Sequence, residues 1–213
     1  MTDDNAAMHT ESTGEKKNRK HKAAMQKQKA KVDARIADAA TIRGVSVLLT
    51  GNGKGKSSSA FGMVMRALGY DQRVGVVQFI KGQQLSGEEM YLKKHCQQVE
   101  FYQMATGFTW DTQDRSGDIR AAEQTWIHAK AMLSNQALDL VVLDELTYML
   151  AYQYLNETEV LAAIQQRPIE QSVIVTGRGG GTALQDIMDT VSEVKNVKHG
   201  FKSGLKARQG VDF

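Results

Sequence analysis

A glycine- and lysine-rich segment is the feature that most constrains the fold of this 213-residue chain. It reads Thr-Gly-Asn-Gly-Lys-Gly-Lys-Ser over residues 50–57, after a short apolar run and before a stretch with helical spacing, residues 57–68. The phosphate-binding P-loop has the pattern Gly, four residues, Gly-Lys-Ser/Thr, between a strand and a helix. The final Gly-Lys-Ser fits this pattern, although Thr50 stands where the first glycine is expected. The segment predicts a loop that binds a nucleoside triphosphate.

Each residue type in this loop has a physical use. Glycines can adopt positive φ and turn backbone N–H groups inward, where the N-terminus of the following helix also attracts phosphate. Lys56 would bridge the phosphate charge, and the Ser57 hydroxyl would reach Mg²⁺. The predicted nucleotide-binding residues are Gly51, Asn52, Gly53, Lys54, Gly55, Lys56, Ser57 and Ser58. The alternative, a glycine-rich turn with a chance Gly-Lys-Ser, does not account for the flanking strand and helix patterns.

A pair of acids forms the second element of the predicted site. The apolar run of residues 138–143 ends at Asp144 and Glu145. P-loop proteins place an acid at such a strand end to hold Mg²⁺ directly or through water. Adjacent carboxylates at a strand end point to different sides, so one would bind the metal while the other orients a water or the ribose. The residues alone leave open which acid does which, and acids at a helix start are also favoured by the helix dipole.

Apolar runs alternate with helical patterns through most of the chain. Strands are expected at residues 45–49, 74–79, 99–102, 138–143 and 172–176, and helices at 57–68, 116–136 and 157–166. This alternation predicts an α/β fold with a mainly parallel sheet and helices on both faces. The expected organisation is a disordered tail over 1–15, a basic helix over 16–43 and a nucleotide-binding catalytic domain over 44–213.

Charge and composition indicate a cytoplasmic protein. Residues 1–43 hold 10 Lys/Arg against 6 Asp/Glu, whereas the remainder holds 17 against 18. The basic N-terminal segment could touch RNA, but it has no interleaved aromatic residues for base stacking, so no nucleic-acid partner is expected. No apolar run approaches the length of a membrane span, and Cys96 is the only cysteine. These features favour a reducing cytoplasm and no membrane association.

The P-loop does not by itself reveal which bond of the nucleotide is broken. The chain has no Ser-His-Asp set and no cluster of His and Cys that could hold a metal, and its five histidines are scattered. A P-loop ATPase or small-molecule kinase therefore stays open as an alternative, with Glu145 as the residue that would orient the attacking water.

Several motifs together resemble the P-loop corrinoid adenosyltransferases of the cob(I)yrinic acid a,c-diamide or cob(I)alamin type. The matching segments, in order, are residues 50–56, 76–82, 105–110, 142–148, 176–179, 189–193 and 198–213. The resemblance runs from about residue 25 to the end, and residues 1–24 have no counterpart. The P-loop of this family also has Thr in place of the first Gly, so Thr50 supports the match.

The resemblance implies transfer of the 5′-deoxyadenosyl group of ATP to the Co(I) of a reduced corrinoid, with release of inorganic triphosphate. The corrinoid would be cob(I)alamin or cobyrinic acid a,c-diamide. The cofactor would be Mg²⁺, and a flavoprotein would be the electron donor. It further implies a RecA-like P-loop fold, a homodimer, and an N-terminal helix that covers the active site. Co(I) is itself a strong nucleophile, so the missing catalytic base fits this reaction.

Lys56 of the P-loop is one predicted catalytic residue. The same resemblance gives a catalytic role to two aromatic residues in a predicted loop, Phe108 and Trp110. They would form an apolar wall that keeps the lower axial ligand off cobalt, which eases reduction of Co(II) and protects Co(I) from water. The alternative is that both rings pack on the core. Candidate anion or corrinoid contacts are Arg178, Lys202, Lys206 and Arg208, for which solvated surface charge is an equal alternative.

Overall fold

The computed structural model describes residues 13–80, 85–104 and 114–212. Contacts divide the chain into two units, Met1–Ile42 and Arg43–Phe213, and each is described by itself. The first contains helix α1, Thr13–Asp38, whose side chains from residue 14 onward are exposed. An ion pair between Lys29 and Asp33 at 2.6 Å, one turn apart, supports this helix. The expected N-terminal helix is therefore confirmed.

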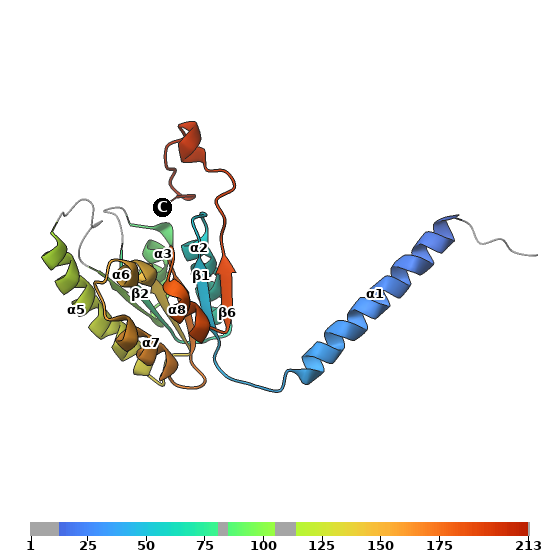
Figure 1. Cartoon of the computed structure of the whole chain (residues 1–213), viewed down its shortest axis with the longest axis horizontal. Coiled ribbons are helices and arrows are strands. Elements are labelled where there is room, and N and C mark those ends of the chain that lie inside the picture. The colour runs from blue at the N-terminus through green and yellow to red at the C-terminus, as the bar shows by residue number, and fades with distance from the viewer. Residues whose placement is uncertain (1–12, 81–84, 105–113, 213) are drawn as a thin grey trace, which may run out of the picture. The chain divides into compact units, whose positions relative to one another are not determined.

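A six-stranded sheet forms the centre of the second unit, and all its strand pairs are parallel (Figure 1). The strands are β1 Ser46–Thr50, β2 Val74–Gln78, β3 Val99–Gln103, β4 Leu140–Asp144, β5 Ser172–Thr176 and β6 Thr190–Glu193. Their order across the sheet is β3-β2-β4-β5-β1-β6. The central strands β2 and β4 are buried throughout, as expected for a sheet that is covered on both faces.

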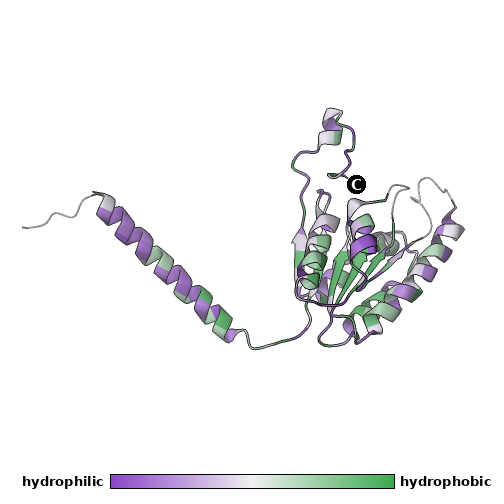
Figure 2. Ribbon diagram, turned by 180° about the vertical axis from the view of Figure 1, so that it is seen from behind, coloured by the Kyte–Doolittle hydropathy of each residue, from purple (hydrophilic) through white to green (hydrophobic). Residues whose placement is uncertain are grey.

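Helices cover both faces of the sheet. They are α2 Lys56–Leu68, α3 Gly87–His95, α5 Arg115–Ser134, α6 Leu146–Ala151, α7 Glu157–Gln165 and α8 Gly181–Ile187, followed by a 3₁₀ turn, η1 Gly200–Ser203. One core cluster joins α2 and α3 to the sheet, and a second joins α5, α6, α7 and α8 to the opposite face. Figure 2 shows the apolar strands between these layers. The predicted α/β architecture with a parallel P-loop sheet is confirmed.

One strand at the sheet edge was not predicted from the sequence. All four residues of β6 are exposed, so the strand lacks the apolar run that marks the others. It pairs with β1 in register Val47–Thr190 to Thr50–Glu193. Within the described ranges, no helix is both long and apolar enough to cross a lipid bilayer.

The strand expected at residues 138–143 starts later and ends at Asp144. The reason is that the backbone before it forms a turn, in which the Leu138 N–H donates to the Asn135 carbonyl at 3.1 Å. The buried Gln171 amide donates to the Asn135 and Leu138 carbonyls of this turn and to the Met132 carbonyl near the end of α5, at 3.0–3.2 Å. A side chain from the loop before β5 therefore fixes where β4 begins.

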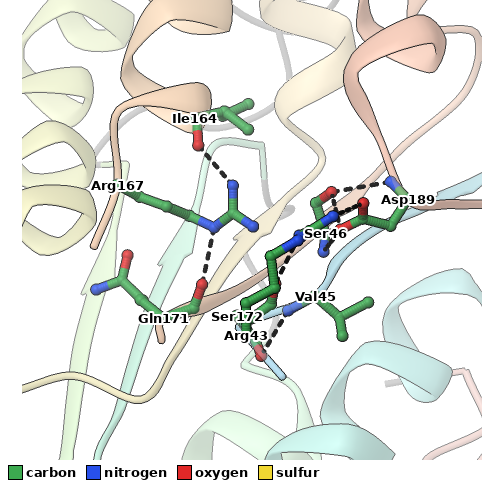
Figure 3. Close-up of polar contacts among 9 residues, drawn as sticks. Arg43, Val45, Ser46, Ile164, Arg167, Gln171, Ser172 and Asp189 are labelled. Carbon is green, nitrogen blue, oxygen red and sulfur yellow. Dashed lines mark hydrogen bonds and ion pairs between the residues drawn. The ribbon is translucent and has the colours of Figure 1, made fainter. Parts of the chain in front are cut away.

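Polar contacts join the start of β1 to the start of β6 at the amino end of the sheet (Figure 3). Both Asp189 oxygens accept from the Arg43 guanidinium, and one also accepts from the Ser46 N–H and hydroxyl at 2.8 Å each. These donors hold the pKa of Asp189 well below its ordinary value, with the Arg43 hydrogen bond as the main cause. The ionised carboxylate thus ties the edge strand to its neighbour.

Replacing Asp189 with asparagine is expected to lower the free energy of unfolding by about 1 kcal/mol at neutral pH, since the ion pair is partly exposed. The pKa of Asp189 is lower in the folded state than in the unfolded state. Its contribution is therefore complete above about pH 5 and is lost as the pH falls toward the folded-state value. Urea unfolding of both proteins from pH 3 to 7 measures the difference, which should shrink with acidity. A constant difference would contradict this account.

Candidate active site

The predicted site elements meet at one edge of the sheet, because the carboxyl ends of parallel strands point the same way. The P-loop follows β1, the two acids end β4, and a glycine-rich loop, residues 177–181, follows β5. These three strands are neighbours in the order β4-β5-β1. Three segments that are far apart in the sequence are therefore brought together where nucleotides bind in open α/β sheets.

The P-loop takes the conformation that its glycines allow. Gly51 and Gly55 have φ of 98° and 116°, a region that side-chain-bearing residues rarely adopt. Gly55 directly precedes α2, and Lys56 is the first residue of that helix. The Lys56 side chain is only 7% exposed, and its ammonium donates to the Gly53 carbonyl at 2.8 Å. The ammonium thus lies inside the loop, beside the amides at the start of α2.

The threonine that departs from the usual P-loop pattern has a structural partner. The Thr50 hydroxyl donates to the Gly179 carbonyl at 2.6 Å, which joins the P-loop to the glycine-rich loop after β5. A second hydroxyl, that of Thr147 on α6, donates to the neighbouring Arg178 carbonyl at 2.9 Å. A glycine at position 50 could not make the first bond. Thr50, in place of the usual glycine, therefore joins two loops of the site by a hydrogen bond.

The segment after β6 also contacts the P-loop. The sequence did not predict this contact. The Val194 carbonyl accepts from the Gly53 N–H at 2.6 Å, and the Val194 N–H donates to the Thr50 carbonyl at 2.8 Å. A Cβ atom on Gly53 would lie 2.7 Å from this carbonyl. Farther along, Asp212 pairs with Lys54 at 2.8 Å. Figure 1 shows this C-terminal segment beside the tip of β1.

The two acids have different surroundings. Asp144 is 3% exposed, and its oxygens accept from the Gln78 amide at 2.9 Å and from the Thr176 hydroxyl at 2.6 Å. Glu145 has φ of 60°, and its N–H donates to the same Thr176 hydroxyl at 3.0 Å. Among the described residues, the buried Oε2 atom of Glu145 finds no hydrogen-bond partner. Asp144 is therefore satisfied within the protein, whereas Glu145 presents an unused oxygen.

The charges in this site depend on one another. Burial, and to a lesser extent the neighbouring Asp144, raise the pKa of Glu145 to about 7, against the opposing effects of Lys56 and Arg178. Burial likewise lowers the pKa of Lys56, partly offset by Glu145 and Asp144. The ammonium of Lys56 and the carboxylates of Glu145 and Asp144 thus stabilise each other's charged forms in a buried site. Strongly perturbed pKa values of buried groups are typical of functional sites.

The residues present fit a magnesium ion bound together with phosphates. No group of three or more His, Cys, Asp or Glu side chains that could hold a metal occurs in the described ranges. A P-loop site does not need one, because Mg²⁺ takes few protein ligands and completes its shell with phosphate oxygens and water. The unpartnered Glu145 Oε2 is the kind of hard oxygen ligand that Mg²⁺ prefers.

Comparisons with known proteins agree with this geometry. Residues 42–213 match the family model of the ATP:corrinoid adenosyltransferases BtuR/CobO/CobP. The chain belongs to this family. It is 53% identical over 188 residues to a corrinoid adenosyltransferase of Escherichia coli K12, covering 88% of the chain and 95% of that protein. It is 50% identical to one of Pseudomonas aeruginosa, covering 92% and 97%, and 37% identical to one of Sinorhizobium, covering 99% of each.

In this corrinoid adenosyltransferase, the structure brings the predicted P-loop and acid pair together at one edge. The side chains of Asn52, Lys54 and Ser58 are exposed, whereas Ser57 is partly buried at the start of α2. Phe108 and Trp110 lie outside the described residues. Arg178 is exposed in the loop after β5, and the C-terminal candidates Lys202, Lys206 and Arg208 are exposed as well.

Sequence reasoning missed two polar residues of this adenosyltransferase site, Gln78 and Thr176, and the backbone groups of Val194. Gln78 and Thr176 each end an apolar strand at the same sheet edge as Asp144. Both are buried and bonded to that acid. A polar residue that closes a buried strand at the carboxyl edge was the signal that could have identified them. Val194 offered no such signal, because it acts only through its backbone.

Proposed function

We propose that the chain transfers the 5′-deoxyadenosyl group of MgATP to the Co(I) of a reduced corrinoid. The observation that carries the proposal is the family membership of a chain whose P-loop and acid pair meet at one edge of the sheet. The electron pair of Co(I) attacks C5′ of ATP, the Co–C bond forms, and the C5′–O bond breaks. Triphosphate leaves with the electron pair of the broken bond, so no proton transfer is required.

The residues of this chain would stabilise the departing triphosphate. The Lys56 ammonium and the amides at the start of α2 lie where negative charge grows as the C5′–O bond breaks. Ser57 and Glu145 would hold Mg²⁺, and Asp144 would support this metal site. When bound, the ion neutralises phosphate charge and orients the triphosphate. The remaining loop residues, Gly51 to Gly55 and Ser58, would bind the phosphates.

An anaerobic assay tests this function. The protein is incubated with ATP, Mg²⁺ and chemically reduced cobalamin, and formation of the Co–C bond is followed optically while the phosphate product is identified. The proposal requires triphosphate as the product and no reaction without corrinoid. Release of ADP, or ATP consumption independent of corrinoid, would instead indicate the ATPase or kinase alternative. No observation in the structure favours that alternative.

Phe108 and Trp110 are proposed to exclude the lower axial ligand from cobalt. Replacing either with alanine is then expected to reduce the rate from Co(II) about tenfold more than the rate from pre-reduced Co(I), because the rings act on the reduction step. Rates with both starting states, with spectra of the bound Co(II) corrinoid in the presence of ATP, measure the effect. Equal losses in both assays with an unchanged spectrum would mean that the rings only pack.

Further features of the family stay predictions for this chain. They are a homodimer, a flavoprotein as electron donor, a cytoplasmic location, and a role for residues 16–43 in covering the active site. Size determination in solution and the activity of a chain that lacks residues 1–43 test the first and the last. A shortened chain that still binds ATP but turns over corrinoid poorly is expected if the segment acts as a lid.

A further inference from the structure

One buried hydroxyl contacts both acids of the site. Thr176, at the end of β5, is fully buried, and its Oγ1 atom donates to Asp144 Oδ1 at 2.6 Å. The same atom accepts the N–H of Glu145 at 3.0 Å. A hydroxyl is suited to this position, because it can donate one hydrogen bond and accept another at once. No carboxylate or aliphatic side chain could make both bonds.

The bond to Glu145 supports an unusual backbone conformation. Glu145 has φ of 60° and ψ of 22°, the left-handed region, which costs a residue with a side chain about 1–2 kcal/mol. Such conformations persist only where the surrounding structure holds them, and they cluster at functional sites. The N–H of Glu145 lies in this constrained peptide, directly before α6. Thr176 is therefore placed to stabilise the turn that sets the direction of the Glu145 side chain.

The other side of Asp144 is occupied as well. The Gln78 amide, at the end of β2, donates to Asp144 Oδ2 at 2.9 Å. Each oxygen of Asp144 therefore has a protein donor from a neighbouring strand. Glu145, by contrast, keeps a buried Oε2 atom for which the described residues supply no hydrogen-bond partner. The geometry thus distinguishes Asp144, whose two oxygens both accept hydrogen bonds, from Glu145, whose Oε2 accepts none from the described residues.

Gly177, the residue after Thr176, completes the arrangement. A Cβ atom at this position would lie 2.0 Å from Thr147 Oγ1 and 3.2 Å from Glu145 Oε2. The backbone after Thr176 thus passes against both α6 and the free carboxylate oxygen. The end of β5 holds the acid pair through one hydroxyl and confines it through the following peptide.

We propose that Thr176 is a positioning residue that, with Asp144 as its anchor, directs the Glu145 carboxylate toward the Mg²⁺ of bound ATP. The inference rests on the proposed function, since it assumes that ATP binds here with Mg²⁺. It assigns different duties to the two acids, with Glu145 contacting the metal or a metal-bound water and Asp144 holding the turn. It also gives the end of β5 a part in metal binding without a metal ligand of its own.

The test compares two substitutions at this position with a control. Thr176→Val keeps the shape of the side chain and removes both hydrogen bonds, whereas Thr176→Ser keeps the hydroxyl. Thr125→Val is the control, because Thr125 is equally buried and donates to the Ala121 carbonyl within α5, at 2.7 Å. For each protein, ATP affinity is measured by calorimetry with Mg²⁺ and with EDTA, and Mn²⁺ binding to the ATP complex by electron paramagnetic resonance.

The Thr176→Val protein is expected to lose at least about tenfold of the Mg²⁺-dependent gain in ATP affinity and to bind Mn²⁺ correspondingly more weakly. Its affinity in EDTA should change less than about twofold. Thr176→Ser should retain the metal effect, and Thr125→Val should retain it even if it unfolds at lower temperature. Thr176→Ala, which leaves room for water, replaces the valine variant if that protein does not fold.

The outcomes separate the inference from the function on which it rests. If the unsubstituted protein gains no ATP affinity from Mg²⁺, the proposed metal binding itself fails. If it gains affinity and Thr176→Val gains the same amount, the inference is overturned, and Thr176 serves only the stability of the fold. An equal loss in Mg²⁺ and in EDTA would likewise overturn it, because the loop and not the metal would then be affected.

Discussion

Replacing Lys56 with alanine is expected to lower kcat/KM for adenosyl transfer by at least about a hundredfold, the size of effect seen when a preorganised charge donor is removed from a transition state. The ammonium is buried in the P-loop and donates to the Gly53 carbonyl. Because it acts on charge that grows on the leaving triphosphate, kcat should fall along with kcat/KM. Steady-state kinetics with pre-reduced cobalamin measure both.

The control for this experiment is Lys94→Ala, which removes an exposed lysine from α3. That protein should turn over at the unsubstituted rate. Thermal unfolding of both variants establishes whether they are folded. If folded Lys56→Ala kept more than a tenth of the original kcat/KM, the P-loop would not be the working site of the reaction.

The largest effect on stability is expected at Gly177, where alanine should lower the free energy of unfolding by about 3 kcal/mol or more. The backbone there has φ of 139°, and a Cβ atom would lie 2.0 Å from the buried Thr147 hydroxyl. That hydroxyl is not free to move, since it donates to the Arg178 carbonyl. Strain in the backbone and a steric overlap therefore add up at one position.

A matched substitution two residues later separates the two causes. Gly179 also has positive φ, 79°, but a Cβ atom there would have no neighbour within 4 Å. Gly179→Ala should therefore show the backbone strain alone, about 1 kcal/mol. Denaturant unfolding curves of the two variants give the comparison. Equal destabilisation of both would show that the contact with Thr147 is relieved at little cost.

The parts of the site that the sequence predicted are those with strong local patterns. The Gly-Lys-Ser segment at residues 55–57 lies between a strand and a helix, and Asp144 and Glu145 follow a run of apolar residues. The acids were predicted as the second element of the P-loop site, and they lie near the loop because the carboxyl ends of parallel strands share one edge of the sheet. Strand positions followed for the same reason, since buried parallel strands are continuous apolar runs.

The remainder depends on partners far away in the sequence. Thr50 departs from the common P-loop pattern, but its use becomes visible only with the Gly179 carbonyl, 129 residues later. Strand β6 has no apolar face, since it lies at the exposed edge and is held to β1 by backbone pairing. The different duties proposed for Asp144 and Glu145 follow from which oxygen finds a donor, and no spacing of residues encodes that.

The two backbone hydrogen bonds that join Val194 to Gly53 and Thr50 have a consequence for how the protein folds during synthesis. During synthesis the P-loop emerges well before the backbone that braces it, because 141 positions of the sequence separate Gly53 from Val194. A nascent chain would therefore possess the phosphate-binding sequence long before it could hold that loop in shape. A ligand stabilises only the state that binds it. ATP would therefore stabilise the completely folded domain and not its N-terminal fragments. Nucleotide binding would thereby indicate that β6 has paired with β1.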